Sequence, residues 1–229
     1  MAGSMSINAA VNDRPAGEAH KQRMDNMYRV QRHFYDVTRA YYLLGRNERM
    51  AALKPPASGS VLEIGCGTGR NLVHLAHLYP DAQIYGLDIS DEMLVTAANT
   101  VERQGLRHRV KLAQGDATTF DGKSFGKLDY DRVLFSYTLS MIPDWLKAMH
   151  TAADRLAPGG ELHIVDFGPC TDLPSLAKSF LYGWLNRFHV SPRLSLFSAS
   201  EELAITRNMA CNIALSHRGY AQHVVVLNH

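Results

Sequence analysis

The sequence predicts an α/β fold: a mostly parallel sheet with a reversed C-terminal strand, helices on both faces and a helical N-terminal cap. Three observations predict it. Strand-like and helix-like segments alternate from residue 60 onward, a glycine-rich turn joins the first strand to the first helix, and the chain closes with a hairpin pattern. The 229 residues, 46% hydrophobic and 20% charged, are typical of one globular domain with elaborations.

The N-terminal 54 residues are expected to form an arm and a cap. Residues 1–20 are small and polar, which predicts a flexible arm, and the opening Met1-Ala2-Gly3-Ser4 resembles the remnant of an expression tag. In the cap, 21–54, apolar residues recur at helical spacing: Met27, Val30, Phe34, Val37, Tyr41 and Leu44. Pro55 and Pro56 mark the boundary to the main domain, 55–229.

The main domain alternates strands with helices, as right-handed βαβ units require. The predicted strands are Ser60–Ile64, Gln83–Asp88, Val110–Gln114, Asp131–Ser136 and Glu161–Asp166. The predicted helices are Arg70–Leu78, Glu92–Arg103 and Asp144–Leu156. The closing hairpin pairs Asn212–Ser216 with Tyr220–Leu227.

The turn after the first strand is the strongest chemical signal. Glu63-Ile64 runs into Gly65-Cys66-Gly67-Thr68-Gly69-Arg70, where glycines permit a tight turn and the close approach of a ligand to a helix N-terminus. Glu63 is expected to order this loop. A dinucleotide fingerprint needs glycine at the sixth position, where Arg70 stands. The pattern Glu-x-Gly-x-Gly-x-Gly instead resembles motif I of the class I S-adenosylmethionine-dependent methyltransferases.

Further matches follow in order and extend the resemblance over residues 58–168. It implies a Rossmann-like class I methyltransferase sheet, with S-adenosylmethionine as cofactor and no metal. Asp88 corresponds to the acid that holds the ribose hydroxyls and Asp116 to the residue that reads the adenine. Arg46 is a candidate to meet the donor's carboxylate, with a solvated surface arginine as the alternative. The implied cofactor contacts are Gly65, Cys66, Gly67, Gly69, Asp88, Ile89, Met93, Asp116, Ala117, Ser136 and Arg46.

A narrower resemblance concerns the acceptor. The blocks 27–39 (MYRVQRHFYDVTR), 41–46 (YYLLGR) and 136–145 (SYTLSMIPDW) are similar to the bacterial diacylglycerylhomoserine N-methyltransferases of betaine-lipid synthesis. That family implies three successive methyl transfers onto one lipid amine, and the enzyme that makes diacylglycerylhomoserine as a partner. Phosphatidylethanolamine N-methylation, quinone-type C-methylation and a non-catalytic lipid- or donor-binding role stay open as alternatives.

Three tyrosines are the candidates for the catalytic group. An amine attacks only when neutral, so the site must accept its proton or lower its pKa. Tyr35 and Tyr42, with Tyr28, recur every seven residues on one flank of the cap helix, and Tyr137 directly follows the fourth strand. The alternative is that these rings only pack the cap against the sheet.

The charge is +2 overall but unevenly distributed. Residues 14–49 carry eight basic and four acidic side chains, and residues 173–200 carry Lys178, Arg187 and Arg193 with no acid. Basic and apolar residues together predict contact with an anionic membrane through 21–49 and 173–193, with 171–200 as a lipid-site insertion. A buried helix is the alternative for the second segment. Nucleic acid is not expected, because the aromatics cluster with aliphatics.

Cysteine content and hydropathy indicate the compartment. Cys66, Cys170 and Cys211 are too few and too far apart for a disulfide framework or a zinc knuckle. No apolar run approaches the roughly 18 residues of a spanning helix. We therefore expect a cytoplasmic protein, peripherally associated with the inner face of the cell membrane.

Overall fold

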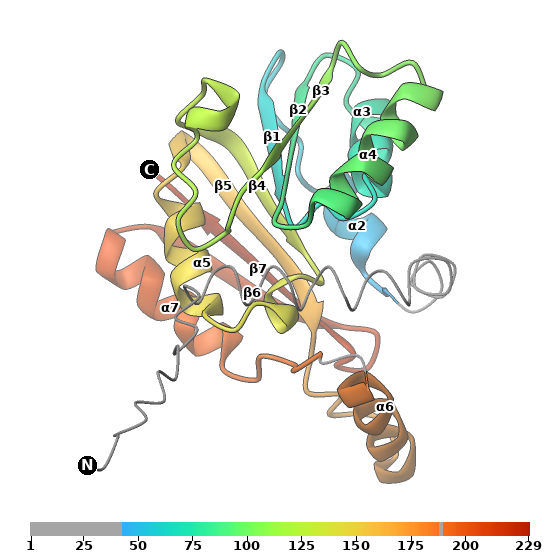
Figure 1. The fold of residues 1–229 in the computed structure, drawn as a ribbon. Coiled ribbons are helices and arrows are strands. Elements are labelled where there is room, and N and C mark those ends of the chain that lie inside the picture. The colour runs from blue at the N-terminus through green and yellow to red at the C-terminus, as the bar shows by residue number, and fades with distance from the viewer. Residues whose placement is uncertain (1–42, 188–189) are drawn as a thin grey trace, which may run out of the picture.

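The computed structural model describes residues 43–187 and 190–229, and Figure 1 shows a central sheet with helices on both sides. The strands are β1 (Ser60–Ile64), β2 (Gln83–Asp88), β3 (Val110–Gln114), β4 (Tyr130–Ser136), β5 (Leu156–Phe167), β6 (Ala210–Ser216) and β7 (Ala221–Leu227). The helices are α2 (Arg46–Ala51), α3 (Arg70–Leu78), α4 (Asp91–Arg103), α5 (Trp145–Ala153), α6 (Ser175–Arg187) and α7 (Leu196–Arg207), with short 3-10 turns η1 (Lys123–Phe125) and η2 (Leu139–Met141). The cap helix expected over residues 27–44 lies, but for Leu43 and Leu44, outside the described residues.

The strand order is β3-β2-β1-β4-β5-β7-β6. Strands β1 to β5 pair in parallel, whereas β7 pairs antiparallel with both β5 and β6. The predicted fold class, a mostly parallel sheet with a reversed last strand, is confirmed. Because β1 and β4 are neighbours, the order of the sheet reverses between them, and ligands bind at the carboxyl ends of such a pair.

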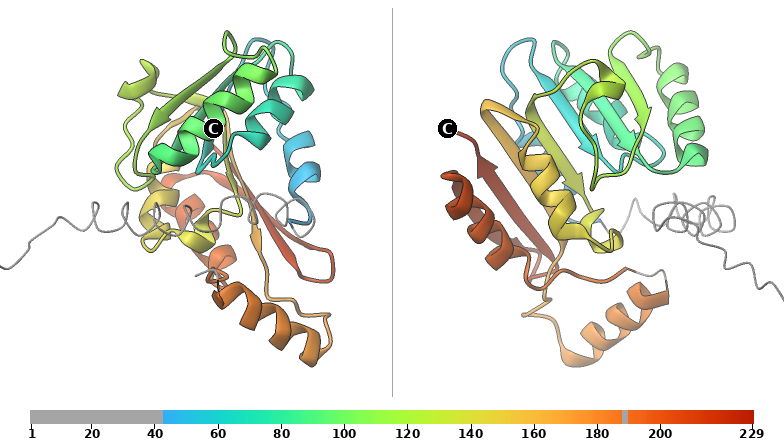
Figure 2. Two further views of the ribbon diagram at one scale, coloured as in Figure 1. Left: turned by 45° about the vertical axis from the view of Figure 1, so that its right-hand side comes forward. Right: turned by 60° about the vertical axis from the view of Figure 1, so that its left-hand side comes forward.

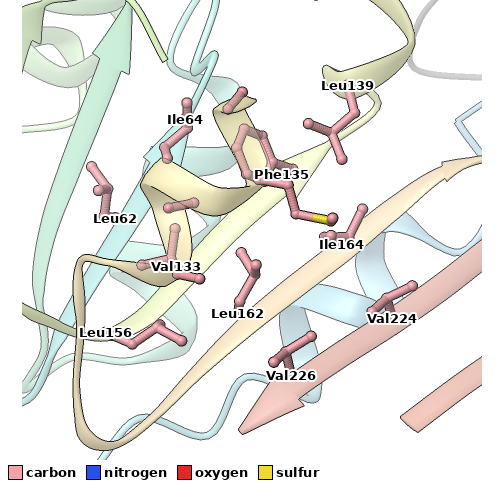
Figure 3. Packing of buried hydrophobic residues seen from close by; sticks show 14 of the residues in the cluster. Leu62, Ile64, Val133, Phe135, Leu139, Leu156, Leu162, Ile164, Val224 and Val226 are labelled. Atoms are coloured by element: carbon pink, nitrogen blue, oxygen red, sulfur yellow. The ribbon is translucent and has the colours of Figure 1, made fainter. Parts of the chain in front are cut away.

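Alternate side chains of each strand contribute to two apolar cores, one on each face of the sheet. Val61 and the buried residues on the same face of the neighbouring strands pack beneath α2, α3 and α4. Leu62 and Ile64 face the other way, toward α5 and α7, in the cluster of Figure 3. This period-two division keeps both faces of the sheet dry and its strands rigid.

Two parts of the fold differ from the sequence-based expectation. Strand β5 begins at Leu156 rather than Glu161, because Leu156 pairs with Tyr130 of β4 and the Gly160 carbonyl accepts from the backbone N–H of Asn228 at 2.9 Å. That partner lies about 70 residues away, so the turn-forming glycines nearby predict a loop. Helix α7 was not predicted at all, since its buried stripe is only partly apolar: Leu196, Ser200, Leu203 and Ala204.

Helix α2, assigned from the sequence to the cap, packs into the main core. Met50 and Leu53 are fully buried against the α3 face of the sheet. The hydroxyl of Tyr79 donates to the Met50 carbonyl at 2.7 Å, and Arg132 donates to the Leu53 carbonyl. These contacts fix the helix that precedes β1 against the rest of the domain.

A polar network lies under α2, where Arg49 reaches two buried histidines. Its guanidinium lies 3.5 Å from Nδ1 of His163 and donates to Nδ1 of His223 at 3.4 Å. With both Nδ1 atoms accepting, each Nε2 donates, to Glu161 (2.6 Å) and to Ser216 (2.7 Å). Burial lowers the pKa of His163 to about 4 despite its bond to Glu161, and burial with the charge of Arg49 lowers the pKa of His223 to about 4.

This network predicts acid-sensitive folding. The unfolded histidines take up protons near their ordinary pKa of 6.5, whereas the folded ones stay neutral down to about 4. The free energy of unfolding should therefore fall as pH drops through this window, by up to about 3 kcal/mol for His163 and by less for the more solvent-screened His223. Urea unfolding at pH 7 and pH 5 measures it. A His163→Gln/His223→Gln variant should lose much of the pH dependence, while the exposed His108→Gln should keep it; equal slopes in all three proteins would contradict the prediction.

Candidate active site

A cleft opens at the carboxyl edge of the sheet, between the loops that follow β1 and β4. The helices after these strands, α3 and α5, cover opposite faces, and a crevice forms where they diverge. The cleft encloses about 420 Å³ outside the protein atoms, part of it open solvent. Its lining residues are Leu43, Arg46, Glu63, Gly65, Cys66, Gly67, Thr68, Arg70, Asn71 and Ser136.

The three glycines of the loop serve different ends, although all have positive φ. A Cβ on Gly65 would lie 2.2 Å from Thr138 Cγ2, and one on Gly69 would lie 2.9 Å from Ala97 Cβ. A Cβ on Gly67 would meet no atom within 4 Å. Packing of the protein itself thus requires Gly65 and Gly69, while Gly67 leaves open space where a ligand can reach the backbone.

Asp88 ends β2 and is almost completely buried. Its Oδ2 accepts from the backbone N–H of Gly67 at 2.7 Å, and its Oδ1 accepts from that of Ser90 at 2.9 Å. The carboxylate therefore joins the glycine loop to the start of α4. It stands beside Gly67, as expected for an acid that holds a ribose.

The other predicted cofactor residues surround Asp88 on neighbouring loops. Asp116 accepts from the backbone N–H (2.7 Å) and the hydroxyl (2.8 Å) of Thr118, which fixes its side chain in a turn. The Ile89 carbonyl accepts from the side-chain amide of Gln114, and Met93 is buried in the first turn of α4. These residues, with Ala117, Gly69 and Asp88, are not among those that line the cleft. The structure thus brings Arg46, Gly65, Cys66, Gly67 and Ser136 together in the cleft.

Several lining residues were not predicted as cofactor contacts. Asn71 donates to Glu63 at 2.6 Å and ties the first turn of α3 to β1 across the loop. Arg70 and Asn71 open the predicted helix, so their place at its N-terminus was a usable signal. Thr68 lies within the glycine motif, so the motif itself was a signal for it. Leu43 gave no signal, because α2 and the short segment before it reach the cleft only through tertiary packing.

Tyr137 follows β4 in a left-handed conformation (φ 56°) and is buried, with only 1% of its surface exposed. Its hydroxyl donates to the carbonyl of Leu44, and its ring packs edge-on against Phe167 at 4.6 Å. Burial raises the pKa of Tyr137 well above its usual 10. The side chain thus supports the segment that carries Leu43 and Arg46. Tyr35 and Tyr42 lie outside the described residues.

Within residues 43–187 and 190–229, no three His, Cys, Asp or Glu side chains are grouped so as to hold a metal ion. In the same part of the chain, no helix is both long enough and apolar enough to cross a bilayer.

The class of protein follows from this geometry and from comparison with known proteins. A family model described as a methyltransferase domain matches residues 61–160. A phosphatidylethanolamine N-methyltransferase of Cereibacter sphaeroides is 31% identical over 160 residues, 65% of this chain and 76% of that protein. The chain belongs to the S-adenosylmethionine-dependent methyltransferases.

Other relatives differ in acceptor. A demethylmenaquinone methyltransferase of Geobacillus stearothermophilus is 31% identical over 62% of this chain and 56% of its own length. A solved Haemonchus contortus phosphoethanolamine N-methyltransferase 2, in complex with S-adenosyl-L-methionine, shares the fold, with a TM-score of 0.61, 19% identity and coverage of 80% of this chain and 52% of that one. Across the first curated relatives, the chain spans from 24% to 76% of their length.

The residues present fit the cofactor of this family. The open space at Gly67 allows a ligand to approach the loop, and Asp88 offers a carboxylate beside it. Arg46 lines the same cleft and supplies a positive charge for a carboxylate. The glycine loop, Asp88 and Arg46 would hold the cofactor, which supplies a methyl group already activated on a sulfonium.

Proposed function

We propose that the chain is an N-methyltransferase that transfers methyl groups, three in succession, to the amine of diacylglycerylhomoserine and so forms a betaine lipid. The observation that carries the lipid acceptor is an apolar, aromatic cluster next to the cleft. It contains Tyr137, Phe167 and Tyr220, with Leu43, Tyr182 and Trp184 packed against it. Leu43 belongs to both this cluster and the cleft, so an apolar acceptor and the donor can meet there.

The main contribution of this chain to methyl transfer is to align the reactants. In-line displacement needs amine, methyl and sulfur on one axis, and holding them there supplies several kcal/mol of the barrier. The glycine loop and Asp88 orient the donor from the β1 and β2 side. Leu43 and Arg46 line the cleft on the α2 side. The hydrogen bond from the Tyr137 hydroxyl to the Leu44 carbonyl holds the segment that carries them in place. Tyr137 acts here as a positioning residue.

The proton of the attacking amine needs an acceptor. Tyr35 and Tyr42 stay our candidates, as does Tyr137 from its place after β4. The raised pKa of Tyr137 keeps its hydroxyl protonated at neutral pH, which favours its positioning role over proton acceptance.

Two alternative acceptors are each supported by a relative. The Cereibacter sphaeroides protein favours phosphatidylethanolamine, and the Geobacillus stearothermophilus protein favours C-methylation of a quinone ring. A non-catalytic lipid- or donor-binding role is a further alternative. For the cell, we propose a cytoplasmic location at the inner face of the membrane, with the enzyme that makes diacylglycerylhomoserine as a partner.

The test supplies purified protein and S-adenosylmethionine with vesicles that carry diacylglycerylhomoserine, phosphatidylethanolamine or a demethylquinone, each separately, and follows lipid masses. We expect mono-, di- and trimethylated products from the homoserine lipid alone. An Asp88→Asn variant, matched in size, serves as the inactive control. Products from phosphatidylethanolamine alone, or from a demethylquinone alone, would replace the proposed acceptor; no product from any of them would overturn the assignment to lipid methylation.

A further inference from the structure

Helix α6 stands away from the body of the protein. It follows the segment that leaves the carboxyl end of β5, and all the views in Figures 1 and 2 show it projecting beyond the sheet. Leu176 is 85% exposed and Phe180 is 78% exposed. Four residues separate them, so they lie on one face of the helix, one turn apart. Large apolar side chains this exposed are not needed for the fold.

The charge around this face has one sign. No Asp or Glu occurs between Asp172 and Glu201. Arg187 is exposed and lies seven residues after Phe180, which is two turns along the same face. Lys178 is half-buried, with its ammonium 5.6 Å from the centre of the Tyr182 ring. Arg193, by contrast, donates to backbone carbonyls in the η2 segment and contributes no outward charge.

The opposite face of α6 holds the helix to the site. Leu185 is fully buried, and the hydroxyl of Tyr182 donates to the Gly168 carbonyl at 3.5 Å. Both rest on the apolar cluster that contains Tyr137 and that Leu43 extends into the cleft. A packed apolar cluster therefore connects α6 to Leu43 at the rim of the cleft.

We propose that the face of α6 formed by Leu176, Phe180 and Arg187 docks on an anionic lipid bilayer. Apolar side chains would enter the acyl boundary while the basic ones meet the headgroups. A second copy fits less well, because a symmetric contact pairs the patch with itself, and the chain between Asp172 and Glu201 has no acid to pair with Arg187. The inference deepens the proposed function and rests on it, since docking here turns the cleft edge toward the lipid that carries the acceptor.

The described end of the basic N-terminal segment does not offer a comparable surface. Arg46 lines the cleft, and Arg49 faces the histidines under α2. Both side chains therefore make their contacts within the protein. Residues 21–42, the rest of the first predicted membrane segment, lie outside the described residues, so the proposal concerns α6 alone.

The test measures co-sedimentation of the full chain with vesicles of phosphatidylcholine and phosphatidylglycerol, and with phosphatidylcholine alone. We expect binding to the anionic vesicles, weakened by salt, and a loss of roughly tenfold or more in the Leu176→Asp/Phe180→Asp variant. The control is Ile205→Asp on α7, because Ile205 is 81% exposed but lies on a helix outside this face. That variant should bind like the unmodified protein.

Three results would overturn the inference: no binding to anionic vesicles, equal binding by the double variant, or equal loss in the Ile205→Asp control. A double variant that dissociates a dimer in sedimentation, without change in vesicle binding, would assign the face to a second copy instead. Lipid methylation is scored separately. Vesicle binding without methylation would retain the docking face and reject the proposed reaction. Methylation together with equal binding by the double variant would retain the proposed reaction and reject the docking face.

Discussion

Asp88→Asn should weaken the binding of S-adenosylmethionine by about 100-fold, corresponding to about 3 kcal/mol. Both carboxylate oxygens accept a backbone N–H, from Gly67 and from Ser90. An amide has only one oxygen, so its NH₂ group must face one of these two donors. The variant thus loses the negative charge offered to the ribose hydroxyls and also loosens the glycine loop.

Titration calorimetry with S-adenosylmethionine and its product S-adenosylhomocysteine measures this effect. Asp129→Asn is the matched control, because Asp129 is exposed and precedes β4 at the opposite edge of the sheet. A thermal unfolding curve for each variant separates lost binding from lost folding. Unchanged affinity in a folded Asp88→Asn protein would contradict the assignment of the cofactor site.

Gly67→Ala should lower donor affinity by at least roughly tenfold while the protein stays folded. The added methyl meets no protein atom within 4 Å and instead occupies the space above the loop. The cost to folding is that of a positive φ (53°) in a residue with a side chain, about 1 kcal/mol.

Gly105→Ala isolates that backbone cost. Gly105 also has a positive φ (68°) and no atom within 4 Å of its Cβ position, but it lies after α4, away from the cleft. Both variants should lose similar stability, and only Gly67→Ala should lose donor affinity. Gly65→Ala should unfold more readily than either, because of Thr138 at 2.2 Å. Equal donor affinity in the Gly67→Ala and Gly105→Ala proteins would show that this space is not the donor's.

The local sequence determined most strands and helices of the main domain and the glycine loop at the centre of its site. The bounds of β1, α3, β2 and β3 agree with those expected, since hydrophobic period and glycine spacing act between near neighbours. The glycine loop was recognisable because all of its residues are consecutive. Asp88 was recognisable because it ends a strand that must lie beside the first.

Contacts between distant residues decided the rest. The Tyr137 hydroxyl donates to the carbonyl of Leu44, 93 positions earlier, so this side chain also holds the segment that leads into α2. Arg49 meets His223 across 174 positions. No periodicity encodes such pairs, because they depend on how α2 packs onto the assembled sheet.

The same reason explains α6 and α7. Both helices carry large apolar side chains, yet α7 buries Leu196 and Leu203 against the sheet while α6 leaves Leu176 and Phe180 exposed. Composition alone therefore left a buried helix and a membrane-facing one as equal interpretations of the second basic segment. The sequence by itself determined the class of protein and the residues of its glycine loop. Only the tertiary structure decided which apolar faces find a partner within the chain, because burial is a property of the packed molecule.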